Sequence, residues 1–163
     1  MKNEIESAED LGHGARNDAH TALFIREIDV ADAEAAARLS EELGYPTTPQ
    51  VMAVRIQRLA HLADRVVFVA CLSQSVVGWI DVGVVHHVQA DPYVEIGGLV
   101  VSSAHRSAGI GQKLIQRAEE WARNRRVATM VVRSRIARQD AHRFYVREGY
   151  EKMKTSVVFS KVL

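Results

Sequence analysis

The chain contains 163 residues, of which 47% are hydrophobic and 25% charged, and its formal net charge is +1. These values are typical of one globular domain and exclude a disordered tail, a fibrous repeat and a strong polyelectrolyte partner. The longest unbroken apolar run, 66–72, is far shorter than the roughly 20 residues that cross a bilayer, and no basic-then-apolar leader opens the chain. We therefore expect a cytoplasmic protein without membrane contact. The one cysteine, Cys71, lies in this run, so we expect it in the core rather than as a nucleophile.

The N-terminal part of the chain divides into an extension and the start of the domain. Residues 1–20 contain acids and glycines without apolar periodicity, which predicts a flexible extension before a single domain at 21–163. A short apolar run predicts a strand at 23–28. Asp29 or Asp32 can cap the helix that is expected to follow to about residue 43.

A second helix is predicted at 49–63, with Thr48 as its cap. Apolar residues recur there at near-helical spacing, at Val51, Val54, Ile56, Leu59 and Leu62. The period then changes, because runs rich in β-branched residues at 66–72 and 76–85 flank a short polar turn and predict a hairpin. Gly78 marks a possible bend or bulge in its second strand.

The C-terminal half is predicted to alternate strands and helices. The expected elements are a strand at 93–101, a helix at 109–123, a strand at 127–132, a helix at 139–148 and a last strand at 157–163. The apolar face of the first of these helices comprises Ile110, Leu114, Ala118 and Trp121, with Ile115 and Ala122 beside them. This order predicts a mixed sheet flanked by helices, with a strand–helix–strand crossover over about 94–132.

The small net charge conceals a division along the chain. Residues 21–104 carry five bases and ten acids, whereas residues 105–147 carry eleven bases and three acids. Such a division suits a protein that holds an anionic cofactor beside a cationic substrate, and it is equally compatible with solvated helix faces.

The most informative segment is the loop that opens the 109–123 helix. It has the pattern R-x-x-G-x-G, from Arg106 to Gly111, and it follows a predicted strand. The free backbone N–H groups and the helix dipole at such a junction suit a pyrophosphate, and Gly109 and Gly111 permit close backbone approach. A dinucleotide loop needs a glycine where Leu114 stands, and a Walker loop needs G-K-[ST], so both are excluded.

This loop resembles the acyl-CoA pyrophosphate loop of the GNAT superfamily of N-acyltransferases. The resemblance runs from about residue 23 to 163, because 94–101 (VEIGGLVV) is similar to the family's central strand and 141–150 (AHRFYVREGY) to its A-x-x-F-Y-x-x-x-G-[FY] helix and turn. It implies a GNAT-like mixed α/β fold, with a sheet of six to seven strands and about four helices. It also implies an acetyl-CoA-dependent N-acetyltransferase that uses no metal.

The resemblance implies where the cofactor is held. Backbone groups of Leu99, Val100 and Val101 would pair with the pantetheine arm where two parallel strands splay apart. The amides of Arg106, Ser107, Ala108, Gly109, Ile110 and Gly111 would hold the pyrophosphate. Lys113 and Arg138 are candidates for the nucleotide end, although the sequence favours solvated positions for both. Arg138 stands where the family often has an asparagine, which puts the usual asparagine contact to the pantetheine arm in doubt.

Acyl transfer to an amine needs an uncharged amine, a stabilised oxyanion and a protonated leaving thiol. By the resemblance, Glu95 is the candidate general base, with Asp81 as a second candidate or as a binder of the substrate's positive charge. Tyr145 is the candidate acid that protonates the thiolate, and Phe144 beside it would point into the core. A backbone N–H near Leu99 or Val100 would meet the oxyanion. Direct attack within a ternary complex is expected, because nothing marks Cys71 as activated.

The acceptor is expected to be a small cationic amine similar to an aminoglycoside or a polyamine. Acidic residues ahead of the loop can collect around it, namely Glu41, Glu42, Asp81, Asp91 and Glu95, with Tyr45 and Pro46 in a possible lid. A protein lysine or N-terminus and a non-catalytic acyl-CoA sensor stay open as alternatives. An interaction domain that dimerises through its C-terminal strands, with a vestigial cofactor site, is a third alternative. A homodimer is also compatible with an enzyme. The histidines match no metal pattern, and the bases lack the aromatic platform of a nucleic-acid site.

Overall fold

The computed structural model describes residues 22–163. A five-stranded mixed sheet forms its centre in the order β1-β2-β3-β4-β5. The strands are β1 (Leu23–Glu27), β2 (Arg65–Leu72), β3 (Ser75–Val85), β4 (Tyr93–Val101) and β5 (Met130–Val132). The first four are antiparallel neighbours, and β5 runs parallel to β4. The predicted fold class and crossover are therefore confirmed, with five strands in place of six to seven.

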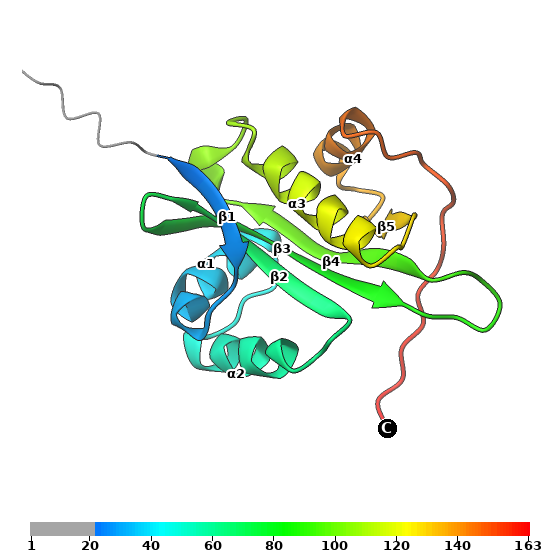
Figure 1. Ribbon diagram of the computed structural model, residues 1–163, viewed down its shortest axis with the longest axis horizontal. Helices are drawn as coiled ribbons and strands as arrows, with labels where there is room; N and C mark the ends of the chain where they lie inside the picture. Colours follow the sequence, from blue (N-terminus) through cyan, green and yellow to red (C-terminus); the bar gives the residue numbers. More distant parts are fainter. Residues whose placement is uncertain (1–21) are drawn as a thin grey trace, which may run out of the picture.

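Helices cover both faces of the sheet (Figure 1). On one face lie α1 (Ala33–Leu43) and α2 (Pro49–Ala60), and on the other lie α3 (Ile110–Asn124) and α4 (Gln139–Arg147). Two short 3-10 helices, η1 (Val30–Asp32) and η2 (Ser103–His105), precede α1 and α3. The main core lies between the sheet and α3, and the predicted face of α3 is buried there as expected.

The connection from β1 to α1 uses its two aspartates differently. Asp29 caps η1 by accepting a hydrogen bond from the Ala31 N–H at 2.8 Å. Asp32 makes no side-chain cap to α1. Its carboxylate is buried and accepts from both terminal nitrogens of Arg26, at 2.6 and 2.8 Å, and from the Asp29 N–H. This ion pair ties the start of the α1 layer to β1.

The predicted inner face of α2 is only partly right. Thr48 caps the helix as expected, but the helix ends at Ala60 rather than at residue 63. Ile56 is buried, whereas Val51 and Val54 are each 45% exposed. The buried strip is narrow because α2 packs against the small side chains of α1, so that Met52 and Ile56 complete the contact. Apolar spacing alone does not show how wide a face the neighbouring helix covers.

Two irregularities bend the central strands. The pairing of β2 with β3 shifts between Ala70 and Cys71, which leaves Val77 as the extra residue, next to the predicted position at Gly78. The pairing of β3 with β4 shifts so that Asp81 faces Gly98 while Val82 faces Ile96, and Gly97 is the extra residue. Cys71 lies in the core as predicted, and burial raises the pKa of its thiol.

The last predicted strand, 157–163, is wrong. Residues 151–163 form no helix or strand, and their large apolar side chains are exposed, with Val157 at 77% and Phe159 at 90%. The physical reason is that β5 is only three residues long, shorter than the predicted 127–132, so its outer edge offers little backbone for another strand. This segment runs from α4 around the edge of the sheet to the face of α1 and α2 (Figure 1).

The predicted N-terminal extension, 1–20, lies outside the described residues. Within 22–163, none of the helices has the length and apolarity needed to span a bilayer.

Candidate functional site: an open strand edge beside a glycine loop

The two parallel strands, β4 and the edge strand β5, separate along their length. They pair only from Val94 to Ile96 of β4 and from Met130 to Val132 of β5. Beyond this point, the β4 residues Gly98 to Val101 pair with β3 alone. Their other backbone edge is open, which is the place where an extended ligand can add itself like a strand. The residues predicted to pair with the pantetheine arm, Leu99, Val100 and Val101, lie in this segment.

The loop after β4 presents backbone donors at the start of α3. Ser107 and Gly109 both adopt left-handed backbone conformations, with φ of 65° and 75°. Gly109 is the N-cap of α3, no side chain caps the first turn, and that turn contains no acid. The first N–H groups of a helix have no partner within the helix, and the dipole favours an anion there. This loop therefore has the geometry of an anion cradle.

Gly111 serves a different purpose from Gly109. A Cβ at Gly109 would meet nothing within 4 Å, so its requirement for glycine is conformational. A Cβ at Gly111 would lie 3.2 Å from two ring carbons of Phe144. The missing side chain lets α4 pack closely on the first turn of α3, and Tyr145 is the residue of α4 that follows this contact. Phe144 packs against the main core as predicted.

Tyr145 lies in an apolar environment. Its ring meets those of Phe144 and Tyr150 edge-on, with centroids 5.3 and 5.6 Å away. Burial raises the pKa of Tyr145 to about 12, although the nearby charge of Arg138 acts in the opposite direction. The phenol therefore keeps its proton at neutral pH, as a proton donor requires.

Glu95 and Arg133 form an ion pair on the other side of β4. Val94 and Ile96 point into the main core, so Glu95 points to the α1 and α2 face. The Nε of Arg133, which follows β5 directly, donates to Glu95 Oε1 at 3.0 Å. The Nη2 of Arg133 donates to the Tyr93 hydroxyl at 3.3 Å. Beyond this pair, Arg135 Nη2 contacts the Tyr45 hydroxyl in the α1–α2 loop at 3.4 Å.

Asp81 is also paired. Arg65 donates from Nε and Nη2 to its two carboxylate oxygens at 2.8 and 2.6 Å. The pair lies under Gly97, since a Cβ there would be 2.7 Å from Arg65 Nη2 and 2.8 Å from Asp81 Oδ2. A bidentate pair of this kind holds both side chains in place and raises the pKa of Arg65.

A known protein family matches most of this chain. The sequence model of the Acetyltransferase (GNAT) family matches residues 23–150. The chain belongs to this family. This is the family that the loop and the A-x-x-F-Y helix predict. A curated relative, the aminoalkylphosphonate N-acetyltransferase of Salmonella typhimurium, is 40% identical over 78 residues, and the match spans 47% of this chain and 51% of that protein.

Solved structures share the GNAT fold at low sequence identity. A transcriptional regulator from Bacillus halodurans has a TM-score of 0.78 and 23% identity, over 86% of this chain and all of that one. An aminoglycoside 6'-N-acetyltransferase from Acinetobacter baumannii has a TM-score of 0.74 and 20% identity, over 87% and 99%. Another aminoglycoside N-acetyltransferase, solved in complex with CoA, has a TM-score of 0.77 and 17% identity, over 86% and 95%. These likenesses confirm the fold.

The residues of this GNAT chain fit a coenzyme A at the open strand edge. The unpaired backbone of β4 and the donor-rich loop are arranged in series, so one elongated molecule with an amide-containing arm and a pyrophosphate can contact both. Arg106 and Lys113 are exposed near the loop. Arg138, the N-cap of α4, lies close enough to Tyr145 for its charge to act on the phenol. The described residues contain no group of three or more potential metal ligands.

The face of the sheet that α1 and α2 cover contains three arginines that sequence reasoning missed. Because Glu95 lies on this face, we call it the acceptor side. Arg65, Arg133 and Arg135 engage Asp81, Glu95 and Tyr45, respectively, across 16, 38 and 90 residues of chain. For Arg65 and Asp81 a signal exists, since the register of an antiparallel hairpin brings 65 and 81 to one face. No local pattern reveals the two later arginines.

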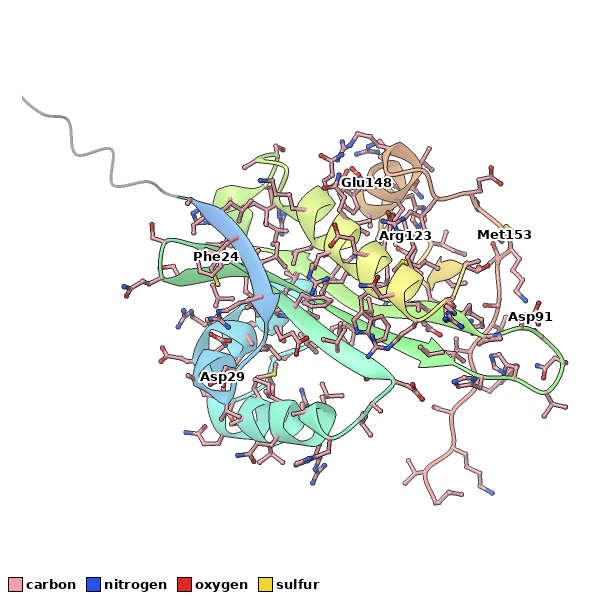
Figure 2. All side chains as sticks on the ribbon, viewed as in Figure 1. Phe24, Asp29, Asp91, Arg123, Glu148 and Met153 are labelled. Atoms are coloured by element: carbon pink, nitrogen blue, oxygen red, sulfur yellow. The ribbon has the colours of Figure 1, made fainter. Side chains whose placement is uncertain are left out.

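The five acidic residues expected around the acceptor are dispersed. Asp91 lies at the tip of the β3–β4 hairpin, at the opposite end of the molecule from α1 (Figure 2). Glu42 accepts a hydrogen bond from the Ser103 N–H at 2.8 Å and so ties the end of α1 to η2. Asp81 and Glu95 have arginine partners. The acids of this face are therefore mostly engaged by the protein itself.

Proposed function

We propose that the protein transfers the acetyl group of acetyl-CoA to the primary amine of a small molecule, by direct attack in a ternary complex. The observation that carries this proposal is the open edge of β4 between the glycine loop and Glu95. Tyr145 lies on α4, the helix that packs on the first turn of α3. The cofactor and the amine then approach the same stretch of backbone from opposite sides. In the reaction a C–N bond forms and the thioester C–S bond breaks.

Each site residue has a proposed role. The backbone of Leu99 to Val101 pairs with the pantetheine arm, and the amides of Arg106 to Gly111 hold the pyrophosphate, with Arg106 and Arg138 adding charge. Glu95 accepts the amine proton, directly or through water. A backbone N–H near Leu99 or Val100 donates to the carbonyl oxygen as it gains charge. Tyr145 donates its proton to the departing sulfur.

A small-molecule acceptor is supported by the names of the relatives. The curated relative acts on aminoalkylphosphonates, and several structural relatives act on aminoglycosides. The sequence alone favoured a polycation because of its acidic residues. With Glu42, Asp81 and Glu95 engaged by protein groups, the proposal extends only to a small primary amine. A cytoplasmic location, predicted from composition, belongs to the same proposal.

A thiol-release assay with acetyl-CoA tests the reaction. The acceptor panel comprises aminoglycosides, polyamines, amino acids, aminophosphonates and peptides with a lysine or a free N-terminus. Calorimetric titration of acetyl-CoA runs in parallel. Amine-dependent release with a small molecule supports the proposal, and release with peptides alone identifies a protein acetyltransferase. Tight binding without release over the whole panel identifies a sensor instead.

A homodimer is part of the proposal, because residues 151–163 are built like an unpaired strand. In an extended conformation, one side carries Met153, Val157, Phe159 and Leu163 with Lys161 among them, and the other side carries Val158 and Val162 between polar residues. The segment is attached beside the free edge of β5, yet it contacts no core of its own chain. We propose that it pairs with the same segment of a second copy, because a β5 of three residues is too short to hold it.

Light scattering on the full chain and on a variant truncated after Glu151 tests the dimer. A dimeric full chain and a monomeric truncated chain support it. The double substitution Val157→Glu with Phe159→Glu should separate the subunits while leaving the circular dichroism of each unchanged. A monomeric full chain whose residues 153–163 are protected from hydrogen exchange contradicts the dimer, because the segment then folds onto its own chain.

A further inference from the structure

Arginines dominate the part of the acceptor side that is open to a ligand. We infer that the acceptor carries an oxyanion, a phosphonate or a carboxylate, a few atoms from its amine, and that Arg135 and Arg133 bind it. This inference rests on the proposed transfer to a small amine and specifies what else that molecule contains.

The carboxylates of this face are not free to bind a second positive charge. Both oxygens of Asp81 accept from Arg65, and one oxygen of Glu95 accepts from Arg133. A polycationic acceptor would have to displace these guanidinium groups, and separating a partly desolvated pair leaves an uncompensated charge behind. The one amine that reacts needs only the remaining oxygen of Glu95.

Arg133 and Arg135, in contrast, have N–H donors that the described residues do not use. A guanidinium offers five N–H donors in a planar fork that matches a carboxylate or a phosphonate. Arg133 uses Nε and Nη2 within the protein and is 56% exposed. Arg135 uses only Nη2, in a long hydrogen bond to Tyr45. Within residues 22–163, the structure shows no hydrogen bond from Nη1 of either side chain.

The position of these two arginines matches the place where an acceptor must lie. They belong to the segment that follows β5, at the point where β5 and β4 separate. Arg133 reaches across to β4, and Arg135 reaches to the α1–α2 loop and lies over the Tyr45 ring with 5.7 Å between guanidinium carbon and centroid. The segment that follows β5 thus carries arginines at 133, 135 and 138 with no acid between them. An oxyanion bound there leaves its amine to extend toward Glu95.

The first test compares acceptors with and without the anionic group. We expect wild-type kcat/KM for 3-aminopropylphosphonate and for 4-aminobutanoate to exceed that for the uncharged diethyl ester of the phosphonate by about tenfold or more, an advantage that falls with added salt. Comparison of the phosphonate acceptor with the carboxylate acceptor shows which of the two anions the arginines bind better. Equal or faster turnover of the ester, or of spermidine, overturns the inference while leaving the acetyl transfer intact.

The second test removes one guanidinium. Arg135→Gln should raise KM for the anionic acceptors about tenfold and leave kcat/KM for the ester unchanged. Arg55→Gln, on the exposed side of α2, is the matched control and should change neither. An equal loss for the anionic acceptors and the ester in Arg135→Gln contradicts anion binding and indicates a structural role for this side chain.

A binding experiment separates this inference from the proposed reaction. Propylphosphonate, which has no amine, is titrated calorimetrically into the protein saturated with coenzyme A. Binding that Arg135→Gln weakens about tenfold supports the anion site even if no amine is acetylated. Absence of propylphosphonate binding to the wild type overturns the inference, whatever the thiol-release assay shows.

Discussion

The cofactor side and the acceptor side of β4 use different chemical groups. On the cofactor side, the functional groups are backbone amides: the open edge of the strand, the left-handed residues Ser107 and Gly109, and the first turn of α3. On the acceptor side, they are long charged side chains from β2, β3, β4 and the segment after β5, held by ion pairs. A backbone site depends on the conformation of one continuous segment. A side-chain site depends on the meeting of segments that are far apart in sequence.

This difference sets how each side responds to substitution. The backbone site changes only where a residue is forced out of its conformation, so most side-chain substitutions in it should have small effects. The side-chain site changes with each charge that is removed. The predictions below test this contrast, and they run from the largest effect to the smallest.

Gly109→Val should abolish high-affinity binding of acetyl-CoA. Valine strongly disfavours the φ of 75° at the N-cap of α3, so the loop must rearrange and its N–H groups turn away from the pyrophosphate. We expect affinity to fall about 100-fold or more, which corresponds to at least ~2.7 kcal/mol. Calorimetric titration of acetyl-CoA measures the change.

The matched control for this loop is Gly44→Val. Gly44 is the C-cap of α1, has a φ of 97°, and would likewise meet nothing with an added Cβ. The substitution strains the backbone to a similar degree, so the protein should lose stability while acetyl-CoA affinity stays unchanged. An equal loss of affinity in both variants would mean that general destabilisation, and not the cradle, explains the effect of Gly109→Val.

Tyr145→Phe should lower kcat about 100-fold while the dissociation constant of acetyl-CoA stays within about twofold. Tyr145 is the one side chain to which we assign chemistry on the cofactor side. Because its pKa is raised to about 12 by burial, it stays protonated throughout the working range, and the wild-type rate should show no titration of this group below about pH 10. The pH dependence of kcat, measured in both proteins, checks this.

Tyr150→Phe is the control for Tyr145→Phe. Tyr150 is also partly buried, its pKa is also raised, and its ring lies 5.6 Å from that of Tyr145. Its hydroxyl contacts Met130 Sδ rather than the loop. We expect nearly normal kcat, and a loss as large as that of Tyr145→Phe would mean that packing between the rings, not proton donation, limits turnover.

The same contrast explains what the sequence predicts and what it does not. Gly109 and Gly111 stand at a spacing that a pyrophosphate loop requires, and the alternation of strands and helices determines the crossover, so both follow from local pattern. The contact of Arg133 with Glu95, and of Arg135 with Tyr45, depends on how far β5 extends and where the chain turns after it. The strand at 157–163 fails for a related reason, since a strand needs a partner edge and the chain's own β5 is too short to supply one.

Asp32→Asn should weaken the acceptor-side layer of the protein. Arg26 lowers the pKa of the Asp32 carboxyl, so its stabilising contribution is present above the ordinary carboxyl pKa of about 4 and is lost as pH falls through the lowered value. At pH 7 we expect a loss of about 2 kcal/mol in the free energy of unfolding, since the Arg26 side chain is partly exposed and screened. Urea unfolding at several pH values should show this difference narrowing in strong acid.

Glu34→Gln provides the comparison for Asp32→Asn. Glu34 pairs with Arg38 on the outer side of α1, where both side chains are mostly exposed, and such pairs contribute about 0.5 kcal/mol or less. A difference between wild type and Asp32→Asn that does not narrow in acid would mean that the lost hydrogen bond to the Asp29 N–H, rather than the charge, explains the destabilisation.

Val54→Gln should have the smallest effect, although sequence periodicity assigns Val54 to the buried face of α2. Its side chain is 45% exposed, so we expect a change within about 0.5 kcal/mol in the free energy of unfolding. Ile56→Ala, on the buried strip beside α1, should cost about 3 kcal/mol. Urea unfolding at low and high protein concentration distinguishes two explanations of any larger loss. A loss that depends on concentration places Val54 in a contact between copies, whereas a loss that does not would mean that α2 packs with a wider face than the structure shows.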